Sequence, residues 1–351
     1  MKGASALLLL CGWATTNPRV SQGRLVYTQA CAACHGQDGR GNPEWESDVR
    51  PVEFTDCGTV AEPTEFWESI VRRGGSPHGL SSIMPAFEQG LAEEDIAAAV
   101  AYLRTLCPRV DAYPPGDLNF RRLLATGKAF PEAEWVLRLS DGGSSGSRSG
   151  ELEIAHENRI GPRFQYEIEL PLRYAAPEGE GRGAGDLKLG AKHVLHFDVP
   201  RRQILSAGLA LALPTGSEAK GLGGGTWAFS PYLAYGKAWG RTMLQSRIGL
   251  KLPTETDKAP RLATYALGLS HAMGLSRSAW TPAAEWVGDV ETETGRHSYG
   301  VWLELSKPLN RLGHVIGAAG VQVPVRPRSD PPRLELYLLW DFGDGPFWQG
   351  W

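Results

Sequence analysis

The stretch Cys31-Ala32-Ala33-Cys34-His35 has the form Cys-x-x-Cys-His, which is the attachment signal for a c-type haem. On one helical turn, cysteines three positions apart share a face, so both thiols can reach the haem edge and form thioether bonds. The adjacent His35 then supplies the proximal ligand of the iron. The run therefore predicts one covalently bound haem c, held by Cys31, Cys34 and His35.

Two other kinds of site use closely spaced cysteines. A zinc site needs a second Cys/His pair at comparable spacing, and the sequence has none. A redox Cys-x-x-Cys needs a βαβ context, which the sequence pattern lacks. Haem attachment is the favoured interpretation, and these two are its alternatives.

Composition indicates an exported chain of two domains. The 351 residues carry a net charge of −3 with evenly mixed acids and bases, which does not indicate a nucleic-acid binder. We expect residues 1–22 to be a secretory signal peptide, because Lys2 precedes an apolar stretch over 4–10 and small residues follow it. Cys11 leaves lipidation as an alternative to ordinary cleavage. Export fits haem attachment in an oxidising periplasm.

Residues 23–108 have a helical pattern around the haem motif. Helices are expected near 27–35, 65–73 and 93–106, and the loop before the last one contains Ser82-Ile83-Met84-Pro85. In order and spacing this segment resembles a class I cytochrome c. In that family an N-terminal helix carries Cys-x-x-Cys-His, and a later loop carries a Met, usually followed by Pro, as the sixth iron ligand. The resemblance implies an all-α domain over 23–108 with Met84 as axial ligand.

The resemblance also implies roles for other residues. The Pro51 carbonyl would accept the second proton of His35. His78 is the rival of Met84 and would give a bis-His site. Three apolar side chains would wall the haem: Trp67, Ile70 and Phe87. Two arginines would face either the haem propionates or solvent: Arg72 and Arg73.

Cys57 and Cys107 do not fit a ligand role. Two leftover cysteines in an exported domain indicate a disulfide, which would tie the Cys57 loop to the end of the last helix. Such a bond stabilises by roughly 2–4 kcal/mol. Unpaired buried thiols are the alternative.

Residues 109–131 form a linker rich in Pro and Gly, after which the sequence pattern changes to a period of two over 132–351. We count about twelve long segments with apolar residues on one side and charged or small residues on the other. Aromatic residues lie near the segment ends. Long strands of this kind predict an antiparallel outer-membrane β-barrel with a polar lumen. A soluble all-β domain in the periplasm is the alternative. One segment alternates as follows: Phe164, Tyr166, Ile168, Leu170, Leu172 and Tyr174.

Three short motifs make this part of the chain similar to the outer-membrane barrel family associated with phenol-degradation pathways. The resemblance implies a barrel and does not imply a substrate. The motifs are Gly185-Asp186-Leu187-Lys188-Leu189-Gly190, Leu213-Pro214-Thr215-Gly216 and Phe229-Ser230-Pro231-Tyr232.

Barrel topology places the haem domain. With an even number of strands, both barrel termini face the periplasm, so we expect the haem domain on that side of the outer membrane. A compact domain of about 85 residues has a radius of gyration of ~12 Å. A lumen of about twelve strands, filled by side chains, is too narrow to take it whole, and docking at the mouth remains open.

These features predict an electron-carrying cytochrome anchored by its own barrel, with no catalytic residues. Its expected partners are periplasmic or extracellular redox proteins, metal-ion electron donors or acceptors, and outer-membrane lipid. One alternative is a transport barrel for a small solute with an accessory haem domain. Another is a peroxidase, which needs an open or labile sixth iron position.

Overall fold

The computed structural model describes residues 17–46, 49–57, 62–78, 80–144, 147–176, 181–274, 279–327, 331–344 and 346–348. Cys11 and most of the expected signal peptide lie outside these ranges. The first described helix begins at Pro18, before the expected start of the haem domain at residue 23. None of the described helices combines the length and apolarity needed to cross a membrane.

The N-terminal domain is helical, as predicted. Its helices are α1 (Pro18–Ala30), α2 (Ala32–His35), α3 (Thr64–Arg73) and α4 (Glu93–Thr105), with 3₁₀ turns η2 (Ser76–His78), η3 (Val110–Ala112) and η4 (Gly116–Leu118). α1 crosses α4 at Gly23, where an added Cβ would lie 1.9 Å from the Ala98 carbonyl oxygen. A side chain at this position would therefore force the two helices apart. The apolar stripe of α4, which includes Ile96 and Val100, is buried in the domain core.

The C-terminal domain is a closed antiparallel β-barrel. Its strands are β1 (Glu134–Ser144), β2 (Ser147–Ile160), β3 (Phe164–Ala176), β4 (Gly181–Ala184), β5 (Lys188–Asp198), β6 (Gln203–Ala212), β7 (Ala228–Trp239), β8 (Thr242–Pro253), β9 (Leu262–His271), β10 (Thr281–Glu291), β11 (His297–Pro308), β12 (Val315–Arg326) and β13 (Arg333–Asp341), with 3₁₀ turns η5 (Glu218–Lys220) and η6 (Phe342–Asp344). β1 pairs with β13, and β2 pairs with β3, which closes the ring. β4 and β5 pair with successive parts of the same edge of β3, so the ring has twelve strand positions, as expected.

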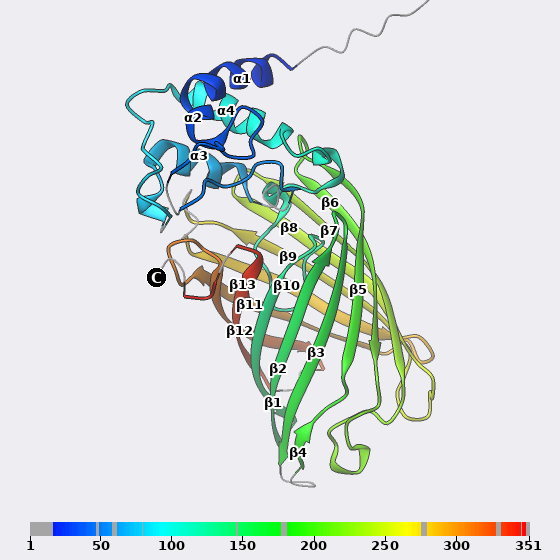
Figure 1. The fold of residues 1–351 in the computed structure, drawn as a ribbon. Helices are drawn as coiled ribbons and strands as arrows, with labels where there is room; N and C mark the ends of the chain where they lie inside the picture. Colours follow the sequence, from blue (N-terminus) through cyan, green and yellow to red (C-terminus); the bar gives the residue numbers. More distant parts are fainter. Residues whose placement is uncertain are drawn as a thin grey trace, which may run out of the picture.

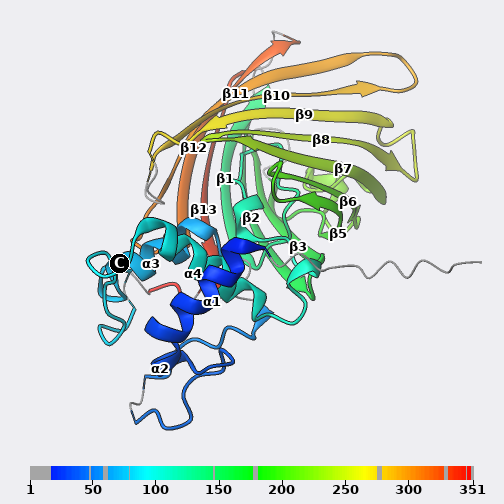
Figure 2. The same cartoon turned by 90° about the horizontal axis from the view of Figure 1, so that it is seen from above.

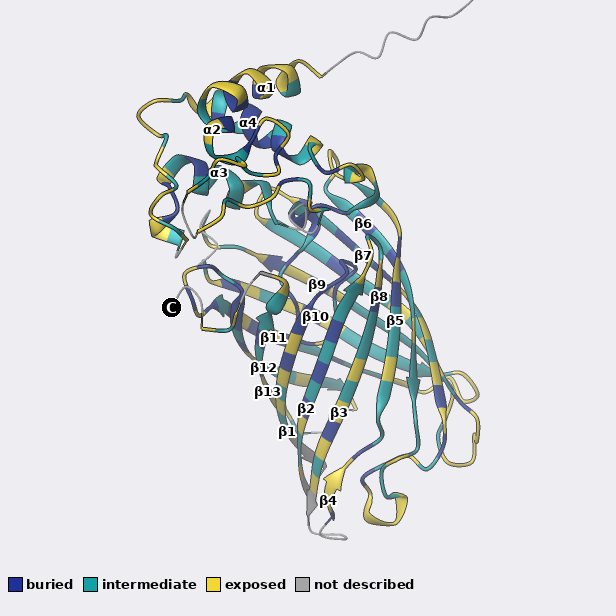
Figure 3. Cartoon of the chain, in the orientation of Figure 1, coloured by how far each residue is buried: buried dark blue, intermediate teal, exposed yellow. Residues whose placement is uncertain are grey.

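Side chains alternate between the outside and the lumen along each strand, as the period of two predicted. On β1, Trp135, Leu137 and Leu139 are exposed. Val136, which lies between Trp135 and Leu137, is buried. On β3, Phe164, Ile168 and Leu170 are exposed, and Gln165 is buried. Figure 3 shows the resulting change of burial from residue to residue along the strands. An exposed apolar outer face around a closed ring is the surface that a transmembrane barrel presents to lipid.

Part of the expected linker lies inside the barrel. Residues 118–132, here called the plug, run from the last residue of η4 to within two positions of the start of β1. Most plug side chains are buried, although a linker between domains is normally solvated. The buried plug residues are Leu118, Phe120, Arg122, Leu123, Leu124, Thr126, Lys128, Ala129, Phe130, Pro131 and Glu132. The segment between the domains therefore acts as internal packing of the barrel.

Glycines on three strands make room for plug side chains. An added Cβ would come within 2.8 Å of Phe120 at Gly236, 2.2 Å of Leu123 at Gly268, and 2.4 Å of Leu124 at Gly320. Polar lumen groups bind the plug backbone. Glu304 accepts from the Leu124 amide at 2.9 Å, and Glu285 accepts from the Ala125 and Thr126 amides at 3.0 and 2.7 Å.

Every strand position of the ring contributes a contact to the plug. The contacting residues, from β1 to β13, are Glu134, Glu157, Gln165, Lys192, Ser206, Gly236, Gln245, Gly268, Glu285, Glu304, Gly320 and Tyr337. Because the contacts run around the whole circumference, the plug fills the lumen at the level where these residues lie.

The helical domain sits at the end of the barrel where β1 begins and β13 ends (Figure 1). Viewed from above, its helices gather on the side of β1–β3 and β13 (Figure 2). Asp117 of η4, just before the plug, is held to α3, because its carboxylate accepts from the Thr64 amide and hydroxyl at 3.1 and 2.8 Å. Arg163 Nε, between β2 and β3, donates to the Ala112 carbonyl at 3.0 Å. The domain thus lies at the mouth, and of the residues that the structure describes the plug is the segment that enters the lumen.

Candidate haem-binding site

The Cys-x-x-Cys-His run forms a tight turn at the junction of α1 and α2. The amides of Cys34 and His35 both donate to the Cys31 carbonyl, at 3.1 and 3.0 Å. Gly36 ends the turn with φ of 75°, a conformation that favours glycine. The Tyr27 hydroxyl donates to the Gly36 carbonyl at 2.6 Å and so fastens the turn to α1. Both cysteines are free thiols.

Electrostatics distinguish Cys31 from the reactive thiol of a redox pair. Burial, together with the neighbouring Cys34, raises the pKa of the Cys31 thiol to about 11. Redox Cys-x-x-Cys motifs instead work with lowered thiol pKa values. The local environment therefore does not favour the redox-dithiol alternative.

His35 is positioned as a neutral imidazole. Burial lowers its pKa, against an opposing hydrogen bond to the Val52 carbonyl. Nδ1 lies 3.4 Å from that carbonyl oxygen, and the ring stacks on Phe54 with centroids 4.7 Å apart. With Nδ1 engaged in this way, Nε2 is the nitrogen left for a metal. The carbonyl expected to face His35 was that of Pro51, so the prediction is wrong by one position. Neighbouring carbonyl groups point in different directions, and the ring can face only one of them.

The Met84 loop is fixed by the end of α3. Gly74 caps that helix with φ of 77°, and the Gly75 amide donates to the Met84 carbonyl at 3.0 Å. An added Cβ on Gly74 would lie 2.8 Å from the same carbonyl oxygen. The paired glycines therefore let the loop fold back closely on α3, and this sets the position of Met84.

One cavity of about 990 Å³ brings the predicted residues together. Its lining includes all three residues of the haem motif, the axial candidate and the expected wall residues: Cys31, Cys34, His35, Met84, Pro51, Trp67, Ile70 and Phe87. Its volume lies at the upper end of the roughly 300–1,000 Å³ range of cofactor pockets.

Two of the other predicted residues lie elsewhere. Arg72 forms an ion pair with Glu93 and is not among the cavity-lining residues, so its role toward the propionates stays a prediction. His78 is also outside the lining; its Nε2 lies 3.2 Å from the Ser69 hydroxyl. The cavity thus contains Met84 and not its rival.

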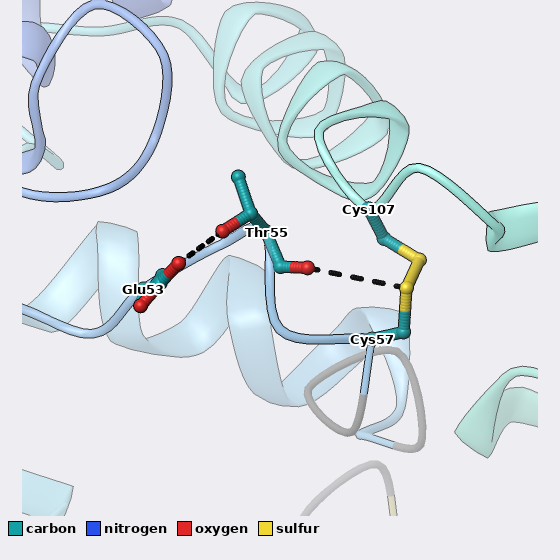
Figure 4. The surroundings of a disulfide bond; sticks show 4 residues. All are labelled: Glu53, Thr55, Cys57 and Cys107. Carbon is teal, nitrogen blue, oxygen red and sulfur yellow. Dashed lines mark hydrogen bonds between the residues drawn. A yellow bond between two sulfur atoms is a disulfide. The ribbon is translucent and has the colours of Figure 1, made fainter. Parts of the chain in front are cut away.

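Cys57 and Cys107 are joined in the expected disulfide, with Cα atoms 5.1 Å apart. Figure 4 shows the bond between the end of α4 and the loop that also contains Glu53 and Thr55. That loop leads from the cavity residues Pro51 and Val52, so the disulfide anchors one cavity wall.

The barrel contributes the remaining wall, which sequence reasoning missed. These lining residues come from the strand ends and turns that face the helical domain: Ala133, Asn158, Arg159, Gly161, Leu312, His314 and Gly343. Each is far from the haem motif in sequence, and no local pattern marks it.

The cavity fits a haem on its own chemistry. Two free thiols, an imidazole and a thioether line this one cavity, and many of the other lining side chains are aromatic or aliphatic. The indole Nε1 of Trp67 is buried and has no hydrogen-bond partner among the described residues. A haem carboxylate is an acceptor that would satisfy this donor.

Comparison with known proteins gives the class of the helical domain: the chain belongs, through this domain, to the c-type cytochromes. Residues 18–103 match the family "Cytochrome C oxidase, cbb3-type, subunit III". A curated relative is cytochrome c-554(548) of Halomonas halodenitrificans, 35% identical over 72 residues, which cover 20% of this chain and 78% of the relative.

The barrel has similar solved structures. The KdgM porin is 13% identical and covers 60% of this chain and 99% of its own, with a TM-score of 0.43. An outer-membrane channel from Pseudomonas putida F1 is 16% identical and covers 65% of this chain and 98% of its own, with a TM-score of 0.45.

Proposed function

We propose that this protein is a mono-haem c-type cytochrome that carries single electrons at the bacterial outer membrane, where its own barrel anchors it. The observation that carries the proposal is the cavity in which Cys31, Cys34, His35 and Met84 meet. The cytochrome family implies that the domain binds haem c. The exposed apolar face of the closed ring supports a membrane location.

Haem in this cavity supplies one-electron exchange between Fe(II) and Fe(III). The protein holds that chemistry in place. Cys31 and Cys34 attach the group, while Val52 and Phe54 orient the His35 ring. Met84 offers a soft, neutral sixth ligand, which favours Fe(II) relative to a second histidine. Because His35 and Met84 would both hold the iron, electron transfer is favoured over peroxidase chemistry.

The haem domain is assigned to the periplasmic side. It sits at the end of the ring where the barrel begins and ends, which is periplasmic in even-stranded barrels. Tight turns lie at the same end, for example between Trp239 and Thr242, whereas the long connection over 213–227 lies at the other. Short turns on the periplasmic side and long loops outside are the usual arrangement. Soluble redox proteins or metal ions that reach this mouth would be its electron partners.

The plug favours this function over solute transport. A transport barrel needs an open path, and contacts from all strand positions fill the lumen around residues 118–132. The barrel then serves as the membrane anchor of the haem domain.

The test uses purified full-length protein in detergent and in proteoliposomes. We expect a covalent haem c spectrum, a Met–Fe(III) band near ~695 nm, and reversible reduction by an external redox protein. A Cys31→Ser/Cys34→Ser variant should lack covalent haem, whereas the matched Cys57→Ser/Cys107→Ser variant should keep it. Covalent haem that persists in the first variant, or solute leakage without haem reduction in the wild type, would contradict the proposal.

A further inference from the structure

We propose that Arg159 of the barrel is a haem-binding residue: its guanidinium binds a haem carboxylate, so that the barrel completes the cofactor site of the cytochrome domain. This inference rests on the proposed haem binding and adds a residue from outside the cytochrome fold.

Arg159 has a donor without an acceptor. It lies at the end of β2 and lines the haem cavity. Its Nη1 atom is buried and has no hydrogen-bond partner among the described residues. An unsatisfied buried donor is destabilising, and more so when it is charged. An anion inside the cavity would remove that cost.

The plug holds the guanidinium in place. The Arg159 guanidinium carbon lies 5.8 Å from the centre of the Phe130 ring, within the distance of a cation–π contact. Phe130 is itself buried in the plug. The plug therefore supports one side of the guanidinium, and the residue lines the cavity. A planar guanidinium is well suited to bind a carboxylate through two donors.

A second orphan donor on the cavity wall agrees with this assignment. Trp67 Nε1, from α3, is also buried without a partner, so two unsatisfied donors from two domains line one cavity. Haem has carboxylates as its only anionic substituents, and a haem attached to Cys31 and Cys34 would bring them into this cavity. The pair of donors thus matches the chemistry of the group.

Nearby cations differ from Arg159. Arg163, across the β2–β3 turn, donates to the Ala112 carbonyl and lies over the Phe197 ring, and it does not line the cavity. Arg72 is paired with Glu93. Arg50 lines the cavity but is exposed to solvent. Arg163 is therefore a matched control, because it has the same charge on the same turn but does not face the cavity.

The experiment is a redox titration of the haem-loaded full-length protein, with haem content measured from the absorption spectrum. A cation beside the haem disfavours the oxidised, more positive state. We expect Arg159→Gln to shift the ratio of oxidised to reduced haem about threefold to tenfold toward the oxidised form at fixed potential, a tenfold change being 59 mV for one electron. The potential should also become more dependent on pH near neutrality, because the carboxylate loses its cation. Arg159→Lys should keep most of the wild-type potential, and Arg163→Gln should leave it unchanged.

The outcomes separate this inference from the proposed function. Wild-type protein without covalent haem would overturn the function first. Haem-loaded Arg159→Gln with the wild-type potential and pH profile would overturn only the role of Arg159. Arg159→Gln could lose haem while its barrel stays folded, and the haem content of Arg159→Lys is then decisive. Haem retained in Arg159→Lys supports the inference. A loss of haem in Arg159→Lys equal to that in Arg159→Gln contradicts it.

Discussion

Arg122 is the buried cation that holds the plug in the barrel, and its removal should open the lumen. Its Nε donates to Glu134 of β1 at 2.8 Å, and its Nη2 pairs with Glu157 of β2. The three side chains are 9%, 0% and 3% exposed. Arg122→Ala would leave two buried carboxylates close to each other without the cation that bridges them.

The free-energy cost of Arg122→Ala depends on the charged groups that remain in the lumen. Breaking a buried ion pair costs about 3–5 kcal/mol because a charge is left uncompensated. Lys128 stays 3.5 Å from Glu134, so we take the lower end, about 3 kcal/mol. At 1.4 kcal/mol per factor of ten, the population with a displaced plug should rise roughly 10²-fold.

Single-channel recording in planar bilayers measures this directly. Wild-type protein should stay closed, and Arg122→Ala should show frequent openings. Hydrogen exchange at the amides of Leu124, Ala125 and Thr126, which the lumen carboxylates now protect, should accelerate in parallel.

Arg138→Ala is the matched control. Arg138 also pairs with two lumen carboxylates, Glu153 and Glu335, yet Arg138 itself belongs to β1 and not to the plug. This variant should keep a closed barrel. Folded Arg122→Ala protein with wild-type conductance and exchange would refute the idea that the plug is held by this charge cluster.

Three further outcomes are expected. Gly23→Ala should lower the stability of the helical domain by about 1–3 kcal/mol, measured by thermal unfolding, because α1 and α4 lose their close approach; an unchanged melting temperature would contradict it. Met84→Leu should abolish the ~695 nm band while His78→Leu retains it, and the reverse result would make His78 the ligand. Cys57→Ser/Cys107→Ser should cost about 4 kcal/mol from the loop of 50 residues that the bond closes, measured by denaturant unfolding, and an equally stable variant would refute that estimate.

Local patterns made the separate parts predictable. The haem motif needs only one helical turn, so Cys31, Cys34 and His35 could be placed from spacing alone. The alternating residues of β3 likewise follow from the strand period, whatever the neighbouring strands are. The Met84 loop was found by its position between two helices, and the Gly74-Gly75 pair that fixes it was visible in the sequence as a helix end.

The meeting of the parts could not be predicted in the same way. Arg159 lines the haem cavity only because the helical domain docks on the mouth, and docking depends on geometry that no local pattern records. The plug did leave a signal. Phe120, Leu123 and Leu124 are more apolar than an exposed linker requires, and lumen-facing glycines such as Gly268 leave space opposite them. The apolar linker residues and the lumen-facing glycines indicate a plug only when they are considered together.

The plug enters and leaves the barrel through the same mouth, and this limits how far the haem domain can travel. Leu118 and Glu134 both lie at that mouth, and the residues between them lie inside the lumen. The chain between the domain and the barrel therefore offers no free linker that would let the domain move away from the mouth. Swinging it outward would pull the plug with it, so a mechanical load on the domain falls on the ion pairs of the lumen. The haem plane should therefore keep one orientation to the membrane normal, and dichroism of aligned membranes would report it as a single fixed angle.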